Sequence, residues 1–418
     1  MASPTTAKSR PGLWGNPDFL KLWAGQSLSL FGSQVTTLAL PLVAVVALGA
    51  TSTEMGVLGA LARAPMVLFL FAGVWADRVR RRPTMIWTDV GRGLMIATIP
   101  ALFLADRLSI AWLYVAVFVV GLLSVFFEVA NQAHLPALVG REHVAEGNGK
   151  MQISNSVAQA AGPSLAGLLV SYFSAAAIVV IDAVSYFASA ICCALIRKPE
   201  EKPGGESQRG GVFAAIAEGV RWLWAQPLLR PMMFATAFYM FFVTGVQTLF
   251  VIYLVEDLHL SGLWLGVVLA AIGVGMVVGA LFSVKILMRV GPGPAAFWST
   301  VVGNTAFLLI PLAGGPLWLA VAMLALSQLL IGLTTPIAQV GMGSLRQVLT
   351  PDELQGRVVA TFRALSLGLA PVGALLAGLL GSAIGLRPTM WLLAVGALIP
   401  IAVIYFSPIP GTRQFPGR

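Results

Sequence analysis

Long apolar runs dominate this sequence and constrain its fold more than any other feature. Twelve runs, each of about 20 residues or more, are long enough to cross the hydrocarbon core of a bilayer as a helix. They cover residues 19–48, 54–76, 84–105, 109–135, 150–173, 176–196, 231–255, 261–288, 295–314, 316–341, 356–383 and 388–407. Backbone polar groups find no water in that core, so each run is expected to be helical. The sequence therefore predicts an all-α membrane protein with twelve transmembrane helices.

The small share of charged residues excludes a soluble enzyme. Only 10% of the residues are charged, whereas soluble domains carry about 25%. The charge is also unbalanced, with 26 Lys and Arg against 17 Asp and Glu. If the N-terminus is cytoplasmic, the predicted outer loops hold only two basic residues, Arg107 and Arg387, as the positive-inside rule requires. We therefore predict a multi-pass protein of the inner (plasma) membrane with both termini in the cytoplasm. The surplus of basic residues then indicates no nucleic-acid partner.

One polar interruption divides the chain into two halves. Residues 197–230 begin with a linker rich in Pro, Gly and charge and continue into an amphipathic stretch, Val212–Trp224, expected on the inner leaflet. The predicted units are a cytoplasmic tail (1–18), a six-helix bundle (19–196), the linker (197–230), a second six-helix bundle (231–407) and a tail (408–418). Short segments recur at an offset of about 210 residues, which indicates duplication. Two repeated bundles imply a central cavity between them, with a ligand near the midplane.

The sequence offers no cofactor site or catalytic centre. Cys192 and Cys193 are adjacent in an apolar run, and the three His residues are dispersed near predicted helix ends, so no metal site is expected. No Ser/His/Asp set, zinc pattern or phosphate-binding loop is visible. The sequence therefore predicts neither a cofactor nor an enzyme.

The predicted loop after the second span carries an ordered set of charges. It resembles the G-x-x-x-D-R-x-G-R-R/K signature of the major facilitator superfamily in keeping Gly73, Asp77, Arg78, Arg81 and Arg82. It departs from the signature at one position, where Arg80 replaces Gly. A carboxylate among guanidinium groups can form a charge-assisted network with a neighbouring helix end and so act as a conformational latch. The alternative is simple anchoring by basic residues on the inner side. The resemblance implies the major facilitator fold.

The fifth span resembles the Gly-Pro pattern of antiporters in this superfamily. Gly149, Gly162, Pro163 and Gly167 match the pattern, and Ala replaces Gly at two further positions. Small residues on one stripe permit close helix packing, which is also the alternative explanation of the pattern. Further segments, among them Ala62–Pro65, Leu135–Val139 and Leu369–Gly373, resemble the branch that contains the enterobactin exporter and the macrolide and Tap-type drug efflux pumps. The resemblance favours export over uptake.

Two carboxylates within the predicted spans are candidates for proton coupling. Ionisable groups at membrane depth are costly, and each is therefore a functional candidate. Glu128, in the inner half of the fourth span, is the first candidate, and the alternative is a static pair with Arg92. Asp182, in the sixth span, is the second, although the resemblance implies a peripheral position for that helix.

Four further charged residues within the spans are candidate intramembrane charge partners. Asp89 and Arg92 are three residues apart, so they share a helix face and are expected to form a structural pair. Arg63 is expected roughly 14 Å down the second span, close to the midplane. It could bind an anion or belong to a fixed ion pair. Arg363 lies within the eleventh span.

Polar side chains at helical spacing indicate where a ligand would bind. The resemblance implies that the first, fourth, seventh and tenth helices line the cavity. The candidate cavity residues are Gln26, Ser29, Ser33, Thr37, Tyr239, Phe242, Gln247, Gln328, Thr335 and Gln339. Aromatic and amide groups together suit a large amphipathic ligand. The alternative is that these groups join helices by hydrogen bonds.

The sequence thus predicts a transporter that exports an amphipathic small molecule (a drug, an antibiotic or a siderophore) by alternating access, in antiport with protons. Its expected partners are the small-molecule substrate, protons and the lipid bilayer, and a monomer is expected. Two alternatives are an importer or facilitator of a small metabolite and a membrane receptor that transports nothing. The substrate, the coupling ion and the stoichiometry stay open.

Overall fold

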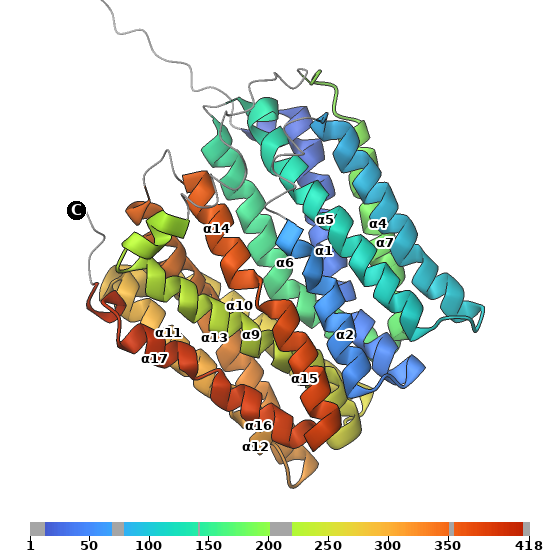
Figure 1. Cartoon of the computed structure of the whole chain (residues 1–418). Coiled ribbons are helices and arrows are strands. Elements are labelled where there is room, and N and C mark those ends of the chain that lie inside the picture. The colour runs from blue at the N-terminus through green and yellow to red at the C-terminus, as the bar shows by residue number, and fades with distance from the viewer. Residues whose placement is uncertain (1–12, 69–78, 141–142, 201–219, 351–354, 413–418) are drawn as a thin grey trace, which may run out of the picture.

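The computed structural model describes residues 13–68, 79–140, 143–200, 220–350 and 355–412 (Figure 1). Every labelled element in these residues is a helix, which confirms the all-α prediction for this part of the chain. We call the helices before the linker the N-terminal set and those after it the C-terminal set. The N-terminal set comprises α1 (Pro17–Leu42) with its π-helical end η2 (Val43–Ala47), α2 (Ser52–Arg63) with the 3₁₀ turn η3 (Ala64–Leu68), α4 (Arg81–Leu104), α5 (Ile110–Val139), α6 (Val144–Tyr172) and α7 (Ala175–Ala194). The C-terminal set comprises α9 (Leu229–Ile252) with η5 (Tyr253–Asp257), α10 (Gly262–Val290), α11 (Pro292–Ala306), α12 (Leu309–Leu312), α13 (Leu317–Leu349), α14 (Gln355–Leu367), α15 (Ala370–Ile384), α16 (Leu386–Gly396) and α17 (Ile399–Tyr405).

Nine helical segments of the described residues are long and apolar enough to cross a membrane, judged by length and composition. The other three predicted spans correspond to α2, α4 and α6. The description of the second span stops at residue 68, and α4 begins with two Arg residues. The first half of α6 carries several amide and hydroxyl side chains. The number twelve therefore stays a prediction.

Local sequence signals explain where the helices begin and end. The Asn16 side chain accepts hydrogen bonds from the backbone N–H groups of Asp18 and Phe19, both at 3.1 Å, and so caps α1. Thr51 and Glu54 form a reciprocal capping box at the start of α2. Gly140 follows α5 with φ of 81°, a conformation that glycine adopts without steric cost.

Several predicted spans differ from the helices observed. The predicted helix over 356–383 is two helices, α14 and α15, because the chain turns at Gly368 and Pro371 occupies the first turn of α15. The twelfth span is divided in the same way before Pro400. By contrast, α6 begins at Val144 and α13 continues to Leu349, beyond their apolar runs. A run of apolar residues indicates only the part of a helix that lipid or protein covers. The polar ends of a helix are therefore not detected from hydropathy.

Each set packs mostly within itself. In the N-terminal set α7 contacts α1 and α4, and in the C-terminal set α13 contacts α10 and α11. The main contacts between the sets join α2 to α15 and α6 to α10 (Figure 1). We call the end where α4 and α9 begin the basic end, because Arg81, Arg82, Lys198 and Arg230 lie there. The other end, where α2 and α10 begin, is the opposite end.

The predicted amphipathic stretch lies partly outside the described residues, which resume at residue 220. Residues 220–225 are helical. The Leu223 side chain is buried in a cluster with Leu229, Met232 and Leu345 of the C-terminal set, whereas Trp224 is exposed. The end of the linker is therefore attached to the C-terminal set.

Candidate functional site

The predicted latch is only partly described by the structure. Gly73, Asp77 and Arg78 lie outside the described residues. Arg81 donates from its guanidinium to the carbonyl oxygen of Ala133 at 2.8 Å. Arg82 donates through Nε to the carbonyl oxygen of Cys193 at 3.0 Å and so caps the end of α7. Arg82 therefore caps the end of α7, whereas Arg81 binds within the last third of α5, and both contacts lie inside the N-terminal set.

Glu200 is a partner at the basic end that the sequence analysis missed. Its carboxylate accepts hydrogen bonds from the backbone N–H groups of Arg81 (2.5 Å) and Arg82 (3.2 Å), which open α4. A carboxylate at this position also complements the positive end of the helix dipole. Nearby, Asp18 accepts from the N–H groups of Arg197 and Lys198 at 3.2 and 3.0 Å. Two acidic residues thus attach the start of the predicted linker to the N-terminal set. The available signal was the pair of acidic residues, Glu200 and Glu201, among the basic residues at the start of the linker.

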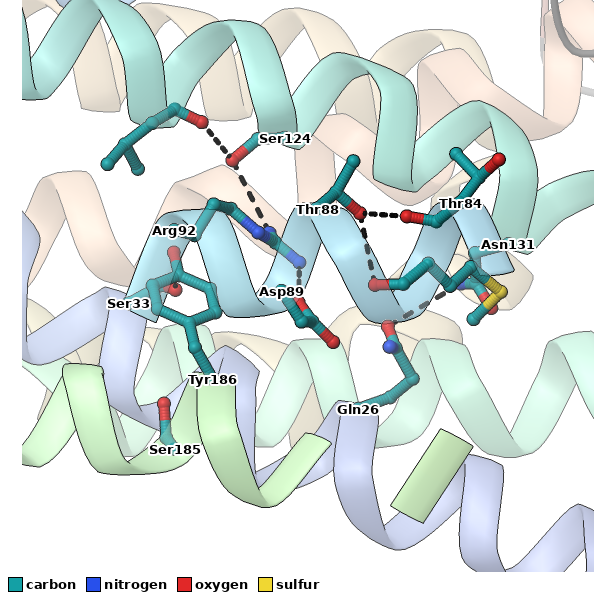
Figure 2. A network of polar contacts seen from close by, with 12 residues as sticks. Gln26, Ser33, Thr84, Thr88, Asp89, Arg92, Ser124, Asn131, Ser185 and Tyr186 are labelled. Atoms are coloured by element: carbon teal, nitrogen blue, oxygen red, sulfur yellow. Dashed lines mark hydrogen bonds and ion pairs between the residues drawn. The ribbon is translucent and has the colours of Figure 1, made fainter. Parts of the chain in front are cut away.

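A buried ion pair occupies the interior of the N-terminal set. Arg92 and Asp89 of α4 pair with each other, and their side chains are 7% and 0% exposed (Figure 2). The Arg92 guanidinium lies between two aromatic rings, 4.2 Å from the ring centre of Phe127 and 4.4 Å from that of Tyr186. It also donates to the Ser124 hydroxyl at 3.4 Å. The cation is therefore shielded on both faces, a geometry that favours cation–π attraction.

Asp182 lies beside this pair, between α1 and α7. It is 1% exposed, and its Oδ1 accepts hydrogen bonds from the hydroxyl groups of Ser33 and Ser185, both at 3.3 Å. Ser33 also shares a hydrogen bond of 2.9 Å with the Tyr186 hydroxyl (Figure 2). No ion pair to Asp182 occurs in the described ranges of the chain. Within the described residues, hydroxyl groups therefore supply the hydrogen bonds to this buried carboxyl. Ser33 links it to Tyr186, whose ring lies against the Arg92 guanidinium.

Glu128 has a different environment on α5. It is half-buried and accepts a hydrogen bond of 3.1 Å from the Gln132 side chain, one turn later in the same helix. Arg92, the partner considered from the sequence, is held by Asp89 instead. The two candidate carboxylates thus differ, since Asp182 is enclosed and Glu128 is partly accessible.

The candidate cavity residues separate into buried and exposed groups. Gln26 and Ser29 are 8% and 7% exposed, and Gln26 accepts from Asn131 of α5 at 3.5 Å. Gln328 is also buried, and Thr335 donates to the carbonyl oxygen of Ile331 in its own helix. The exposed members are Thr37, Gln247 and Gln339, whereas Ser33, Tyr239 and Phe242 are half-buried. Helix-joining hydrogen bonds therefore account for Gln26 and Ser33, as the alternative interpretation proposed.

One polar contact joins the two sets at mid-depth. Arg63, the last residue of α2, donates through Nη2 to the side-chain oxygen of Gln247 in α9 at 3.0 Å. Arg63 lies eleven positions after Ser52, the first residue of α2, so it is about 17 Å from that helix start. Both side chains are at least partly exposed. The side chain of Arg363 lies outside the described residues.

The glycines of the antiporter-like pattern have three different environments. A Cβ built on Gly162 would collide with Gln34 of α1, so this glycine brings α6 and α1 together. A Cβ on Gly167 would lie 2.8 Å from the carbonyl oxygen of Gly266, so this glycine permits the contact between the two sets. Around Gly149 a Cβ would meet nothing within 4 Å, and tight packing does not explain that position. The side chain of Pro163 lies outside the described residues.

The sets meet closely at the opposite end. A Cβ built on Gly56 of α2 would lie 2.7 Å from the Cα of Gly378 in α15 and 3.0 Å from the carbonyl oxygen of Ala374. The hydroxyl groups of Thr53 and Ser382 share a hydrogen bond beside this crossing. Backbones approach this closely only where no side chain stands between them.

Replacing Gly56 by Val is therefore expected to weaken the contact between the sets at the opposite end. Overpacking of this kind costs about 1–3 kcal/mol. Spin labels at Leu104 and Trp318, both exposed near that end, should show a shift to longer distances in a variant without native cysteines. Gly149→Ala is the matched control and should leave the distances unchanged, and an unchanged distribution in Gly56→Val would contradict the expected role of the crossing.

Comparison with known proteins places the chain in a family. Residues 22–370 match the Major Facilitator Superfamily. The multidrug efflux pump Tap of Mycolicibacterium fortuitum is 27% identical over 82% of this chain and 84% of its own. The macrolide efflux protein A of Streptococcus pyogenes is 24% identical over 91% and 93%, and the enterobactin exporter EntS of Escherichia coli O1:K1 is 27% identical over 76% and 74%.

The fold is similar to that of solved transporters. The crystal structure of the nucleoside transporter NupG aligns with a TM-score of 0.68 at 12% identity, covering 94% of this chain and 98% of the other. The family match over residues 22–370 shows that the chain is a multi-pass membrane transporter rather than an enzyme. It belongs to the Major Facilitator Superfamily.

Proposed function

We propose that this protein exports amphipathic small molecules, of the drug, antibiotic or siderophore class, from the cytoplasm by alternating access and in antiport with protons. The observation that carries the direction is the set of relatives, since the three described above are named as efflux pumps or as an exporter. The protein would act as a monomer in the inner membrane, with the basic end in the cytoplasm. The excess of basic residues at that end supports this orientation.

The contacts between the sets support a state that is open toward the cytoplasm. Gly56 meets Gly378 and Gly167 meets Gly266 close to the opposite end, and Arg63 meets Gln247 at mid-depth. With the basic end in the cytoplasm, these contacts close the route to the outside. Separation of the same contacts would open it, which is the rigid-body exchange expected of two repeated bundles.

Asp182 is the carboxyl that we favour for proton coupling, ahead of Glu128. Its protonation state determines the direction of its hydrogen bonds with neighbouring hydroxyl groups. The ionised form accepts from Ser33 and Ser185, whereas the protonated form must donate one hydrogen bond. Gly32 allows α1 to approach α7 at this point, because a Cβ there would lie 2.8 Å from Oδ1 of Asp182. A proton at Asp182 is therefore well placed to alter the contact between α1 and α7.

Transport into or out of vesicles tests the proposal directly. The protein is reconstituted in proteoliposomes of known orientation with a macrolide, a tetracycline or a cationic dye as the test solute. An imposed pH gradient should drive at least one of these solutes from the basic-end side to the other side. Collapse of the gradient with an ionophore should abolish accumulation. Movement in the inward direction only, or movement that ignores the gradient, would contradict the proposal and favour an importer or facilitator.

A further inference from the structure

The guanidinium of Arg63 lies at the boundary between the two sets with very little to satisfy it. Its described contact is the single hydrogen bond from Nη2 to Gln247, a neutral acceptor. Arg carries five N–H donors in a planar fork, so most of its donors have no protein acceptor in the described residues. The ion pairs within those residues all lie elsewhere, at Lys21, Arg92 and Lys150.

The depth of this contact makes it significant that no described acidic residue pairs with Arg63. Arg63 is about 17 Å from the start of α2, and Gln247 is ten residues, or about 15 Å, before the end of η5 at Asp257. Both values correspond to the middle of a core of roughly 30 Å. A cation at this depth normally pairs with an acidic group or lines a polar pathway. Arg92 illustrates the first solution, whereas Arg63 has no acidic partner within the part of the chain that the structure describes.

The local backbone changes from α-helix to 3₁₀ helix directly after Arg63. The α-helical part of α2 ends at Arg63, and Pro65 stands in the following 3₁₀ turn, where its missing N–H cannot continue the α-helical pattern. A stretch of 3₁₀ helix within a longer helix often marks a functional position. The negative end of α2 stabilises the Arg63 charge in part, but it consumes none of the guanidinium donors directed away from the helix.

Gln247 of α9 supplies a second polar side chain beside the Arg63 guanidinium. It is exposed, while its neighbours Val246 and Thr248 in α9 are buried at 3% and 6%. Its amide can accept from Arg63 through oxygen and still donate through nitrogen. An oxygen-rich anion placed beside the pair would therefore receive donors from both sets at once.

We propose that Arg63 and Gln247 form a binding position for a carboxylate group of the transported molecule. This inference rests on the proposed export function and narrows its substrate class to amphipathic molecules that carry an acidic group. Arg binds carboxylates in a bidentate manner, which gives both affinity and orientation. Because the two residues come from different sets, a bound carboxylate would also join the sets at mid-depth.

Equilibrium binding of two matched dyes tests the inference without any gradient. The probes are rhodamine B, which has a free carboxylate, and its ethyl ester, in which that group is blocked. Fluorescence polarisation with the full-length protein in nanodiscs should give a Kd roughly tenfold lower for the acid than for the ester, the size expected of a charge-assisted hydrogen bond. Arg63→Gln should remove this preference, and Arg63→Lys should keep part of it.

A second variant separates ligand binding from a role in holding the sets together. Gln247→Glu places a carboxylate beside Arg63, so it should compete with the dye acid and abolish the preference while leaving ester binding in place. A purely structural role for Arg63 would change the two affinities by the same factor in Arg63→Gln. Arg107→Gln, a loop arginine at the opposite end, is the control and should keep the preference.

The inference and the proposed function can fail independently. Equal affinities of the two dyes for the unaltered protein, including absence of binding of either dye, would overturn the inference. So would a preference for the acid that survives in Arg63→Gln. Failure of gradient-driven transport with an intact acid preference would instead overturn proton-coupled export and leave the binding position in place.

Discussion

Replacing Arg92 by Leu should lower the free energy of unfolding by about 3–5 kcal/mol, the largest stability change that we expect at any single position. The substitution leaves Asp89 as a buried carboxylate with its counter-ion removed, and Asp89 is fully buried. It also removes the cation that lies between Phe127 and Tyr186. Unfolding by a denaturing detergent in mixed micelles would measure the change.

The chain supplies a matched control for this prediction. Lys21 and Asp18 form a second ion pair with the same spacing of three residues, but their side chains are 28% and 16% exposed. Lys21→Met should therefore cost about 1 kcal/mol or less. Replacing both members of the buried pair, Asp89→Asn with Arg92→Met, should recover much of the loss. A loss in Arg92→Leu no greater than that in Lys21→Met would show that the buried pair contributes little.

Replacing Asp182 by Asn should make transport insensitive to the pH gradient, with gradient-driven accumulation reduced at least tenfold. Asn has nearly the same shape and can hydrogen-bond with Ser33 and Ser185, so the packing between α1 and α7 is expected to persist. It cannot gain or lose a proton in the transport cycle. Binding of solute at equilibrium should therefore change little. Proteoliposome accumulation and nanodisc binding, measured on the same preparation, would separate the two effects.

Two further variants decide between the candidate carboxylates. Asp182→Glu should restore part of the gradient dependence, because the titrating group is retained. Glu128→Gln should leave that dependence in place, because its carboxylate accepts from Gln132 at a partly accessible position of α5. If Glu128→Gln abolishes coupling and Asp182→Asn does not, Glu128 is the residue that binds the coupled proton, and our preference for Asp182 is wrong.

The sequence predicted the helices well because the bilayer acts on composition directly. An apolar run must become a helix in lipid, so residues 109–135 anticipated α5 at Ile110–Val139 with small errors. The interruption at Gly368 was missed because glycine and proline are frequent in membrane helices and most do not break them. The polar ends of α6 and α13 were missed because hydropathy detects only the apolar part of a helix.

The site was less predictable, because its contacts join residues far apart in the sequence. The i,i+3 spacing of Asp89 and Arg92 was enough to anticipate their pair. No local pattern could indicate that Arg63 meets Gln247, 184 positions later, or that Glu200 would cap α4. Spacing placed Gln26 and Ser33 on one face of α1 correctly. It could not distinguish a face that lines a cavity from one that packs against α5 and α7.

The glycine crossings between the sets have a consequence for how such a protein can change. Gly56 with Gly378 and Gly167 with Gly266 join the sets backbone against backbone, so no side chain stands between the helices at these two contacts. The candidate cavity residues Gln247 and Gln339 are exposed and take no part in these glycine contacts. Under the proposed function, point substitutions at such positions would change the substrate selectivity and leave the glycine contacts between the sets unchanged. Under the proposed function, such a scaffold could acquire a new substrate while it keeps the contacts through which the two sets separate and close.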